Sequence, residues 1–193
     1  MRKKIKNEVI YEAALKVFAK YGYRKTTLED IAGEMDMTAA NLYAYFQSKR
    51  ELYEQTVSYA MLRWQTKVRG AVSKKRKAVE KLNTLCSGAL YYLKEDPEFT
   101  ALLESDPSIF PMFPTVDPYE EINAASIHMI EDILNLGAKT GEFRKLDSAA
   151  VSRVIFGMYK SFIIRAYVQG ETEFIEENLP QTMDLLLKGI ESK

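Results

Sequence analysis

The sequence predicts an all-α protein: an N-terminal three-helix domain followed by a helical bundle. Apolar residues recur at intervals of three and four through most of the chain, as on one face of a helix. Residues that start helices (Ser, Thr and Pro) and residues that end them (Gly) stand between these segments. Hydrophobic residues make up 47% of the 193 residues, with only 9 Gly and 6 Pro, which suits a packed globule. We divide the chain into residues 1–56 and residues 57–193.

The first predicted helix ends at Gly22, because glycine readily adopts the left-handed conformation that closes a helix. Its apolar residues recur at helical spacing and should face the core of the small domain. They are Ile10, Ala13, Ala14, Val17, Phe18 and Tyr21.

Three further helix starts follow closely along the chain. Thr26 with Glu29, and Ser48 with Glu51, match the capping box, in which a hydroxyl and a carboxylate satisfy free backbone N–H groups. Thr38 is a third candidate cap and opens a predicted helix over residues 39–46.

The turn before that helix reads Met35-Asp36-Met37, and Asp36 is the predicted left-handed residue because Asp tolerates this conformation. Two short helices around a tight turn form the layout of a DNA-reading helix-turn-helix. The second of them leaves small and polar residues free in its N-terminal half, where a recognition helix touches base edges. These are Ala39, Ala40, Asn41 and Ala44.

The runs TTLEDIA, from Thr26, and LYAYFQSKREL, from Leu42, resemble the N-terminal domain of the TetR-like transcriptional regulators. The resemblance covers about fifty residues with several fixed spacings. The chain departs from it at Asp36, where Gly is frequent, and at residues 39–41, where Lys-Gly-Thr or a similar run is frequent. With Ala39 in place of a long cation, Asn41 becomes the best candidate for a two-point contact with a base edge.

The resemblance implies that Thr27, Tyr43 and Lys49 contact DNA phosphates and so position the domain. Each has a simpler interpretation: Thr27 as part of a cap, Tyr43 as a packing residue and Lys49 as a solvated lysine. The complete predicted DNA-binding set is Thr27, Thr38, Ala39, Ala40, Asn41, Tyr43 and Lys49.

The charge of the chain is polarised. Residues 1–77 hold 17 Lys or Arg against 8 Asp or Glu, a net charge of +9, and residues 78–193 hold 10 against 19, a net charge of −9. A basic N-terminal part suits a domain that neutralises phosphates. Residues 1–56 alone carry only +2, so most of the excess lies beyond them.

The sequence disfavours several other classes of protein. One Cys and one His make neither an internal disulfide nor a familiar zinc site, and no catalytic motif surrounds either residue. We therefore expect no metal, no cofactor and no enzymatic activity. No apolar run is long enough to span a membrane and no signal peptide is evident, so we expect a cytoplasmic protein.

Five more helices are predicted after the one that Ser48 starts, with a Pro-rich apolar loop after the second of them. The loop contains Ile109, Phe110, Met112, Phe113 and Val116, and either covers a cavity or packs as core. The predicted helices cover residues 48–72, 75–95, 97–105, 118–140, 147–169 and 172–191.

The resemblance implies a homodimer formed through the last two helices, which would read a palindromic operator in double-stranded DNA. Small residues on the first of them, Ala150, Gly157 and Ser161, permit close helix approach. The last helix has Leu185 and Leu187 beside a continuous apolar stripe. That stripe, Ile175, Leu179, Met183, Leu186 and Ile190, either meets the partner or faces its own core.

The sequence and the resemblance together favour a repressor that leaves its operator when a small, mostly apolar ligand binds the C-terminal domain. The acidic C-terminal part suggests a neutral or cationic ligand. The alternative is a DNA-bound protein of the same fold that acts through a partner protein. The candidate pocket residues are the apolar and aromatic side chains expected inside the bundle, namely Leu90, Tyr91, Phe99, Leu103, Phe110, Phe113, Met129, Phe156, Tyr159 and Phe162.

Overall fold

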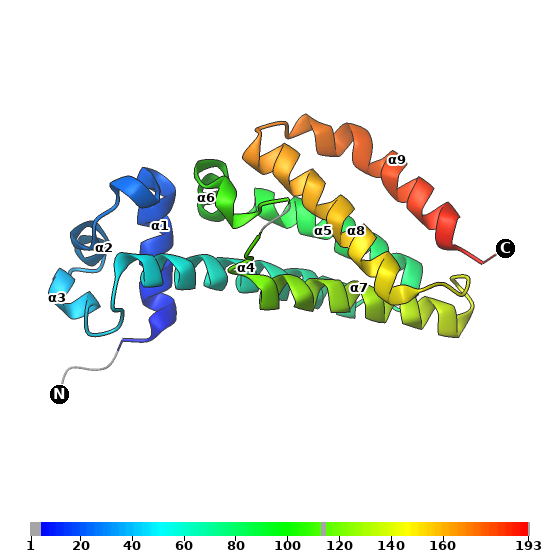
Figure 1. Ribbon diagram of the computed structural model, residues 1–193, viewed down its shortest axis with the longest axis horizontal. Coiled ribbons are helices and arrows are strands. Elements are labelled where there is room, and N and C mark those ends of the chain that lie inside the picture. The colour runs from blue at the N-terminus through cyan, green and yellow to red at the C-terminus, as the bar shows by residue number, and fades with distance from the viewer. Residues whose placement is uncertain (1–4, 113–114, 193) are drawn as a thin grey trace.

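A computed structural model describes residues 5–112 and 115–192, and nearly all of its regular structure is helical (Figure 1). Within these ranges no helix is both long enough and apolar enough to cross a membrane. The elements are α1 (Asn7–Lys25), α2 (Leu28–Glu34), α3 (Ala39–Leu42), α4 (Lys49–Ser73), α5 (Ala78–Lys94), α6 (Pro97–Ser105), η1 (Pro107–Ile109), α7 (Glu120–Thr140), α8 (Ser148–Ile163), η2 (Ile164–Val168) and α9 (Glu173–Ile190).

Helices α1, α2 and α3, with the first turns of α4, form a small lobe that we call the head; the rest of the described chain is the body. Gly22 interrupts α1 with a φ of 74°, as predicted for a helix stop. The predicted inner face of α1 is buried except at Tyr21, which is 46% exposed, so that part of the prediction is wrong. The buried face of α1 ends at Phe18, and the helix projects from the core by Tyr21.

The cap of α2 lies one residue later than predicted. The Asp30 amide donates to the Thr27 hydroxyl (3.1 Å), and the Thr27 amide donates to the Asp30 carboxylate (2.8 Å). The predicted pair of Thr26 and Glu29 is therefore wrong. Thr26 is buried and its hydroxyl donates to the Gly22 carbonyl (2.9 Å), so it cannot cap the next helix.

The other predicted features of the head are mostly confirmed. Asp36 has a φ of 52° and is the left-handed pivot of the turn. Ser48 caps α4, accepting from the Glu51 amide at 3.1 Å, although the Glu51 carboxylate accepts from the Gln47 amide (2.7 Å) instead of completing the box. Helix α3 is shorter than predicted: it ends at Leu42, and the chain continues in tight turns to residue 46.

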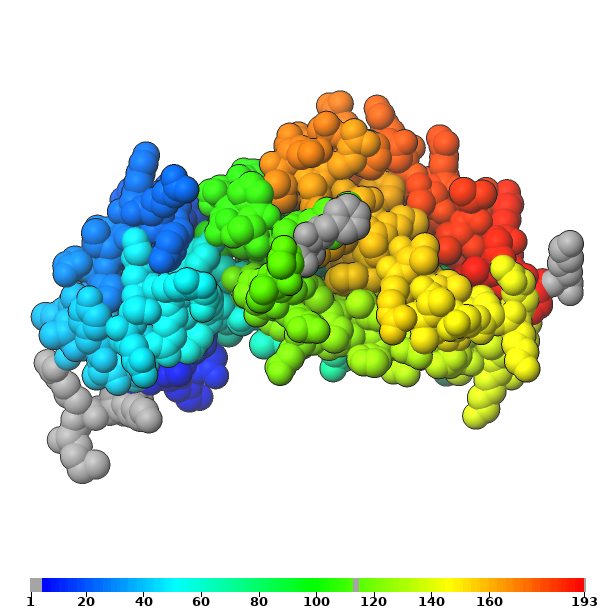
Figure 2. Space-filling view, viewed as in Figure 1, coloured from blue at the N-terminus to red at the C-terminus, as the bar shows by residue number. Residues whose placement is uncertain are grey.

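Helix α4 joins the head to the body as one continuous helix of 25 residues (Figure 1). Its first turns bury Leu52 and Val57 in the head, and later turns bury Trp64 and Val68 in the body. The green surface of α6 lies directly against the blue and cyan surface of the head in Figure 2. The head therefore contacts the body through α4 and α6.

The loop after α6 is split between core and surface. Ile109 and Phe110 are 1% and 2% exposed, whereas Met112 and Val116 are 38% and 81% exposed. The loop thus packs as core at its start and faces solvent later. Phe113, also predicted in this loop, lies outside the described residues.

The predicted helix over residues 147–169 has a more complex form. Regular α8 ends at Ile163 and continues as the π-helical turn η2. On α9, four members of the predicted stripe (Ile175, Leu179, Met183 and Ile190) are buried within the chain itself, and only Leu186 is partly exposed. The stripe faces its own core, which was the second of the two interpretations.

Candidate functional site

The predicted DNA-contacting residues lie on the exposed end of the head. Thr27, Thr38 and Ala40 are exposed at or near the N-termini of α2 and α3, and Ala39 is half-buried. Tyr43, just after α3, is 59% exposed and does not pack in the core of the head. This arrangement leaves the first turn of α3 free to approach a major groove.

Asn41 is half-buried and helps to cap its own helix. Its side-chain oxygen accepts hydrogen bonds from the Thr38 amide (3.3 Å) and the Thr38 hydroxyl (2.9 Å). The two N–H donors of the Asn41 amide make no hydrogen bond with any described residue and could meet acceptors on a base edge. The role of Asn41 in reading bases remains a prediction.

Lys49, at the start of α4, is hydrogen-bonded to the C-terminal end of α1. Its ammonium group donates to the carbonyl oxygens of Tyr23 and Thr26, both at 2.9 Å, and lies 4.6 Å from the centre of the Tyr23 ring. An ammonium group has three donors, so one remains for a DNA phosphate. The phosphate contact of Lys49 stays a prediction, but the residue is more than a solvated lysine.

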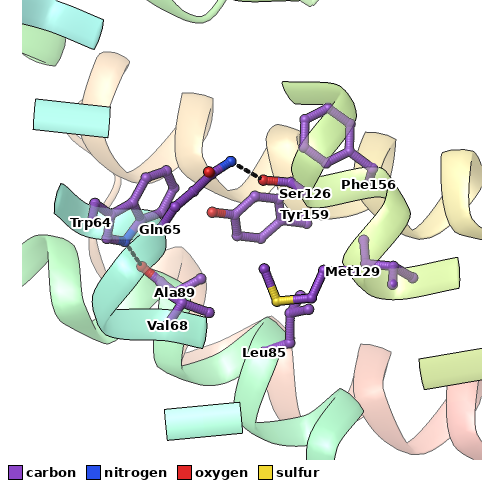
Figure 3. Close-up of a pocket in the computed structure, with 10 residues that line it drawn as sticks. Trp64, Gln65, Val68, Leu85, Ala89, Ser126, Met129, Phe156 and Tyr159 are labelled. Carbon is purple, nitrogen blue, oxygen red and sulfur yellow. Dashed lines mark hydrogen bonds between the residues drawn. The ribbon is translucent and has the colours of Figure 1, made fainter. Parts of the chain in front are cut away.

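The body contains a small cavity with a volume of about 20 Å³, which is room for about one water molecule and well below the usual range for ligand pockets, so a larger ligand would have to widen it (Figure 3). It lies among α4, α5, α7 and α8, and its lining is mostly apolar. The lining residues are Trp64, Gln65, Val68, Leu85, Ala89, Ser126, Met129, Ile130, Phe156 and Tyr159.

One end of the cavity is polar. The Gln65 side-chain amide donates to the Ser126 hydroxyl (2.6 Å) and to the Ile122 carbonyl (2.5 Å). Tyr159 is buried, and burial raises the pKa of its hydroxyl well above the usual value, so it stays protonated. In Figure 3 its oxygen is turned toward the end where Gln65 and Ser126 meet. A ligand could therefore find hydrogen-bonding partners there.

The cavity brings together three of the predicted pocket residues, Met129, Phe156 and Tyr159. The sequence interpretation missed the contribution of α4, although Trp64 and Val68 stand one helical turn apart on its buried face. Of the other predicted residues, Tyr91 is 47% exposed, Phe113 lies outside the described residues, and the rest are buried in the packed core. Those buried residues are Leu90, Phe99, Leu103, Phe110 and Phe162.

A charged network links the head to the body beside the cavity helix. Arg63 on α4 donates from Nη1 to both carboxylate oxygens of Glu12 on α1 (2.7 and 2.9 Å), and from Nη2 to Asp96 (2.6 Å), the cap of α6. Burial opposes the ionisation of Glu12, but hydrogen bonds from Tyr59 and Arg63 outweigh it and lower its pKa. Three helices therefore meet at one guanidinium group.

The described residues hold no group of three or more His, Cys, Asp or Glu side chains placed to bind a metal ion. Cys86 is fully buried, and burial raises the pKa of its thiol to about 12, so almost none of it is thiolate at neutral pH. An inert thiol of this kind is structural.

Comparison with known proteins identifies the head. Residues 10–56 match the sequence model of the tetR family of bacterial regulatory proteins. The biofilm operon icaADBC HTH-type negative transcriptional regulator IcaR of Staphylococcus aureus (strain Newman) is 44% identical over 48 residues, which are 25% of this chain and 26% of IcaR. The head is therefore a domain of the tetR family type.

Beyond the head the likeness to known proteins is more distant, and the chain matches only about a quarter of the length of IcaR. The fatty acid metabolism regulator protein of Bacillus subtilis (strain 168) is 23% identical over 195 residues, covering 100% of this chain and 99% of that protein. The crystal structure of the transcriptional regulator FadR from Bacillus subtilis in complex with stearoyl-CoA superposes with a TM-score of 0.71 at 20% identity, covering 95% of this chain and 96% of FadR. The whole described chain thus has the TetR-like fold.

Proposed function

We propose that this TetR-like regulator is a homodimeric repressor that leaves a palindromic operator when a small, mostly apolar ligand enters the cavity of the body. The observation that carries the proposal is the double role of α4. The same rigid helix supplies Leu52 and Val57 to the core of the head, and Trp64 and Val68 to the wall of the cavity. A ligand that displaces the wall must also move the head.

The Arg63 network supplies a second path between the two parts. A shift of α4 changes the separation of Arg63 from Glu12 in the head or from Asp96 at the start of α6. Couplings between sites usually amount to about 1–3 kcal/mol, which corresponds to a loss of operator affinity of about 5- to 150-fold. A change of that size is sufficient for a switch.

Two exposed apolar side chains support the dimer. Val154 on α8 is 71% exposed and Leu185 on α9 is 76% exposed. A side chain added at Gly157 would meet no atom within 4 Å, so this part of α8 is open to a partner helix. Two heads related by a two-fold axis would reach major grooves about 34 Å apart.

The chemistry of the cavity supports an apolar ligand, because eight of its ten lining residues have apolar or mainly apolar side chains. The structure of Bacillus subtilis FadR, a protein of the same fold, is in complex with stearoyl-CoA. We therefore extend the proposal to a ligand with an acyl or similar hydrocarbon chain. Regulation of this kind takes place on DNA in the cytoplasm.

The test begins with selection of binders from a random duplex DNA pool at near-physiological salt. We expect a palindrome whose half-sites lie about one helical turn apart. The selected duplex then serves to measure release by acyl-CoA thioesters of increasing chain length, with the fluorescence of Trp64, the sole tryptophan, reporting occupation of the cavity.

If no DNA sequence is enriched, and the protein binds DNA weakly and with a strong dependence on salt, the proposed repressor is contradicted. Selection of a palindrome from which no apolar compound releases the protein would instead favour the same fold acting through a partner protein.

A further inference from the structure

Lys160 on α8 is a buried cation. The residue is only 6% exposed, and its ammonium group makes no hydrogen bond or ion pair with any other described residue. Its nearest aromatic neighbour is Phe110, whose ring centre lies 6.0 Å away, at the outer limit of a cation–π contact. A lysine in such a place destabilises the free protein, because burial of a charge without a partner costs free energy.

The acidic residue near Lys160 is engaged elsewhere. Asp117 accepts hydrogen bonds from the Tyr119 amide (2.9 Å) and the Asn123 side chain (2.7 Å). These bonds tie Asp117 to the start of α7. Burial lowers the pKa of Lys160 and outweighs the charge of Asp117, which favours the charged form of the lysine. Asp117 thus offsets only part of the cost of burying the charge, and the ammonium donors of Lys160 remain for another anion.

Lys160 does not line the cavity itself but lies on α8 beside two residues that do. It follows Tyr159 in the chain and lies one helical turn after Phe156, and both of these line the cavity. Phe110, the ring beside its ammonium group, packs at 6.2 Å against Trp64, which lines the cavity from α4. One aromatic ring, that of Phe110, therefore separates the cation from Trp64 in the wall of the cavity.

We infer that Lys160 binds an anionic group of the ligand, and that the ligand is an apolar chain bearing a carboxylate or a phosphate. This inference rests on the proposed ligand-responsive function and specifies the class of ligand. It departs from the neutral or cationic ligand suggested by the net charge, because a local buried cation outweighs acidic residues that are exposed to solvent. The apolar chain widens the small cavity between Trp64 and Met129, and the anion meets Lys160.

Three probes with the same chain separate the possible head groups: decanoate, decyl phosphate and decanol. Trp64 fluorescence gives their affinities for the full-length protein. We expect at least one anion to bind about tenfold or more tightly than decanol, which is the effect of one charge-assisted hydrogen bond. The anion that binds more tightly identifies the head group as a carboxylate or a phosphate.

Lys160→Met keeps the length of the side chain and removes its charge. The variant should bind decanol as the wild type does and lose its preference for the anion. Since a buried unpaired charge is removed, its melting temperature without ligand should rise by about 2–4 °C. Lys139→Met, at an exposed lysine on α7, is the matched control and should change neither property.

Three results would overturn the inference: equal affinity of the wild type for all three probes, an anion preference that survives in Lys160→Met, or no binding of any probe. The failure of the proposed function would look different. Release of operator DNA by decanol without any dependence on Lys160 would keep the function and overturn the inference. Tight binding of an anion that depends on Lys160 but has no effect on DNA binding would keep the inference and overturn the proposed function.

Discussion

Tyr53 on α4 donates a hydrogen bond of 2.5 Å to the carboxylate of Asp106, directly after α6. The Tyr53 ring is buried in the head, where it packs edge-on against Phe18 at 5.0 Å and at a tilt of 46° against Tyr23 at 4.7 Å. Asp106 begins the loop that carries Phe110 to the cavity region. The head is therefore hydrogen-bonded directly to the segment whose Phe110 packs against Trp64 in the cavity wall.

Tyr53→Phe should weaken communication between ligand and DNA. The variant keeps the aromatic packing and removes only the hydroxyl, so the free energy of unfolding should fall by about 1.5–3 kcal/mol, the usual value of a bond to a charged group. Operator affinity should change little, while the ligand should release DNA less completely. Urea unfolding and ligand titrations of the DNA complex measure the two effects. Tyr91→Phe, at an exposed tyrosine, is the control, and full release in Tyr53→Phe would contradict the coupling role.

Arg63→Met should destabilise the contact between head and body by about 1–3 kcal/mol, because two carboxylates lose a charged partner. Arg50→Met removes an exposed pair with Glu54 and should have little effect. Unfolding by urea compares the two variants. Equal losses of unfolding free energy in Arg63→Met and Arg50→Met would show that the position of Arg63 between three helices has no special importance.

The same network predicts a dependence on pH. The pKa of Glu12 is lowered in the folded protein, so its ionised form stabilises the fold above the ordinary pKa of 4.5, and that contribution is lost as the pH falls through the lowered value. Stability of the wild type should therefore decline below about pH 4.5, more steeply than that of Arg63→Met. Thermal melts between pH 7 and pH 3 check this, and parallel curves would contradict it.

Asp36 has a left-handed backbone, which costs most residues about 1–2 kcal/mol. Asp36→Val should lower stability by roughly that amount, since a branched side chain fits this conformation poorly. Asp36→Gly should leave stability unchanged or slightly higher. Glycine adopts the left-handed conformation without strain, which raises stability, but its greater freedom in the unfolded chain offsets that gain. Differential scanning calorimetry ranks the three proteins. A Val variant as stable as the wild type would show that the turn can rearrange.

Leu185→Glu should dissociate the proposed homodimer, because a charge would be buried where an apolar contact is expected. The dissociation constant should rise by at least about tenfold, and operator affinity should fall with it. Val116→Asp, at an apolar residue that is 81% exposed in the loop, is the control. Sedimentation equilibrium gives the assembly state. A Leu185→Glu variant that remains dimeric would place the interface elsewhere.

Asn41→Ala should change the base preference at one position of each half-site, at a cost of about 1–3 kcal/mol for the preferred base. The variant also removes the acceptor for Thr38 in the cap of α3, so its stability must be measured in parallel. Asn41→Asp keeps the acceptor for Thr38 and removes only the amide donors, so a change of preference shared by both variants does not come from the cap. Repeated selection from random DNA shows the preference. An unchanged sequence would exclude Asn41 as a base-reading residue.

Several features of the fold could be predicted from the sequence because they depend on neighbouring residues. The left-handed turn at Asp36, the cap at Ser48 and the continuous helix after it all follow from interactions within four positions along the chain. The family resemblance in the head is equally local, since it consists of fixed spacings within residues 10–56.

The cavity could be predicted only in part. Periodicity indicates which face of a helix is apolar, but it does not say which helix packs against that face. Phe99 and Phe156 are both apolar residues on helices, yet Phe99 fills the core and Phe156 lines an empty space. That difference arises from the fit between helices distant in sequence.

The sequence by itself determined the all-α class, the helix-turn-helix head and most helix boundaries, because these depend on propensity and capping over a few residues. Only the tertiary structure decided that Thr27 and not Thr26 caps α2, that Trp64 joins the cavity wall, and that Lys160 is a buried cation. The physical reason is the same in each case. The free energy of these side chains depends on groups brought together by packing, and local sequence carries no record of those partners.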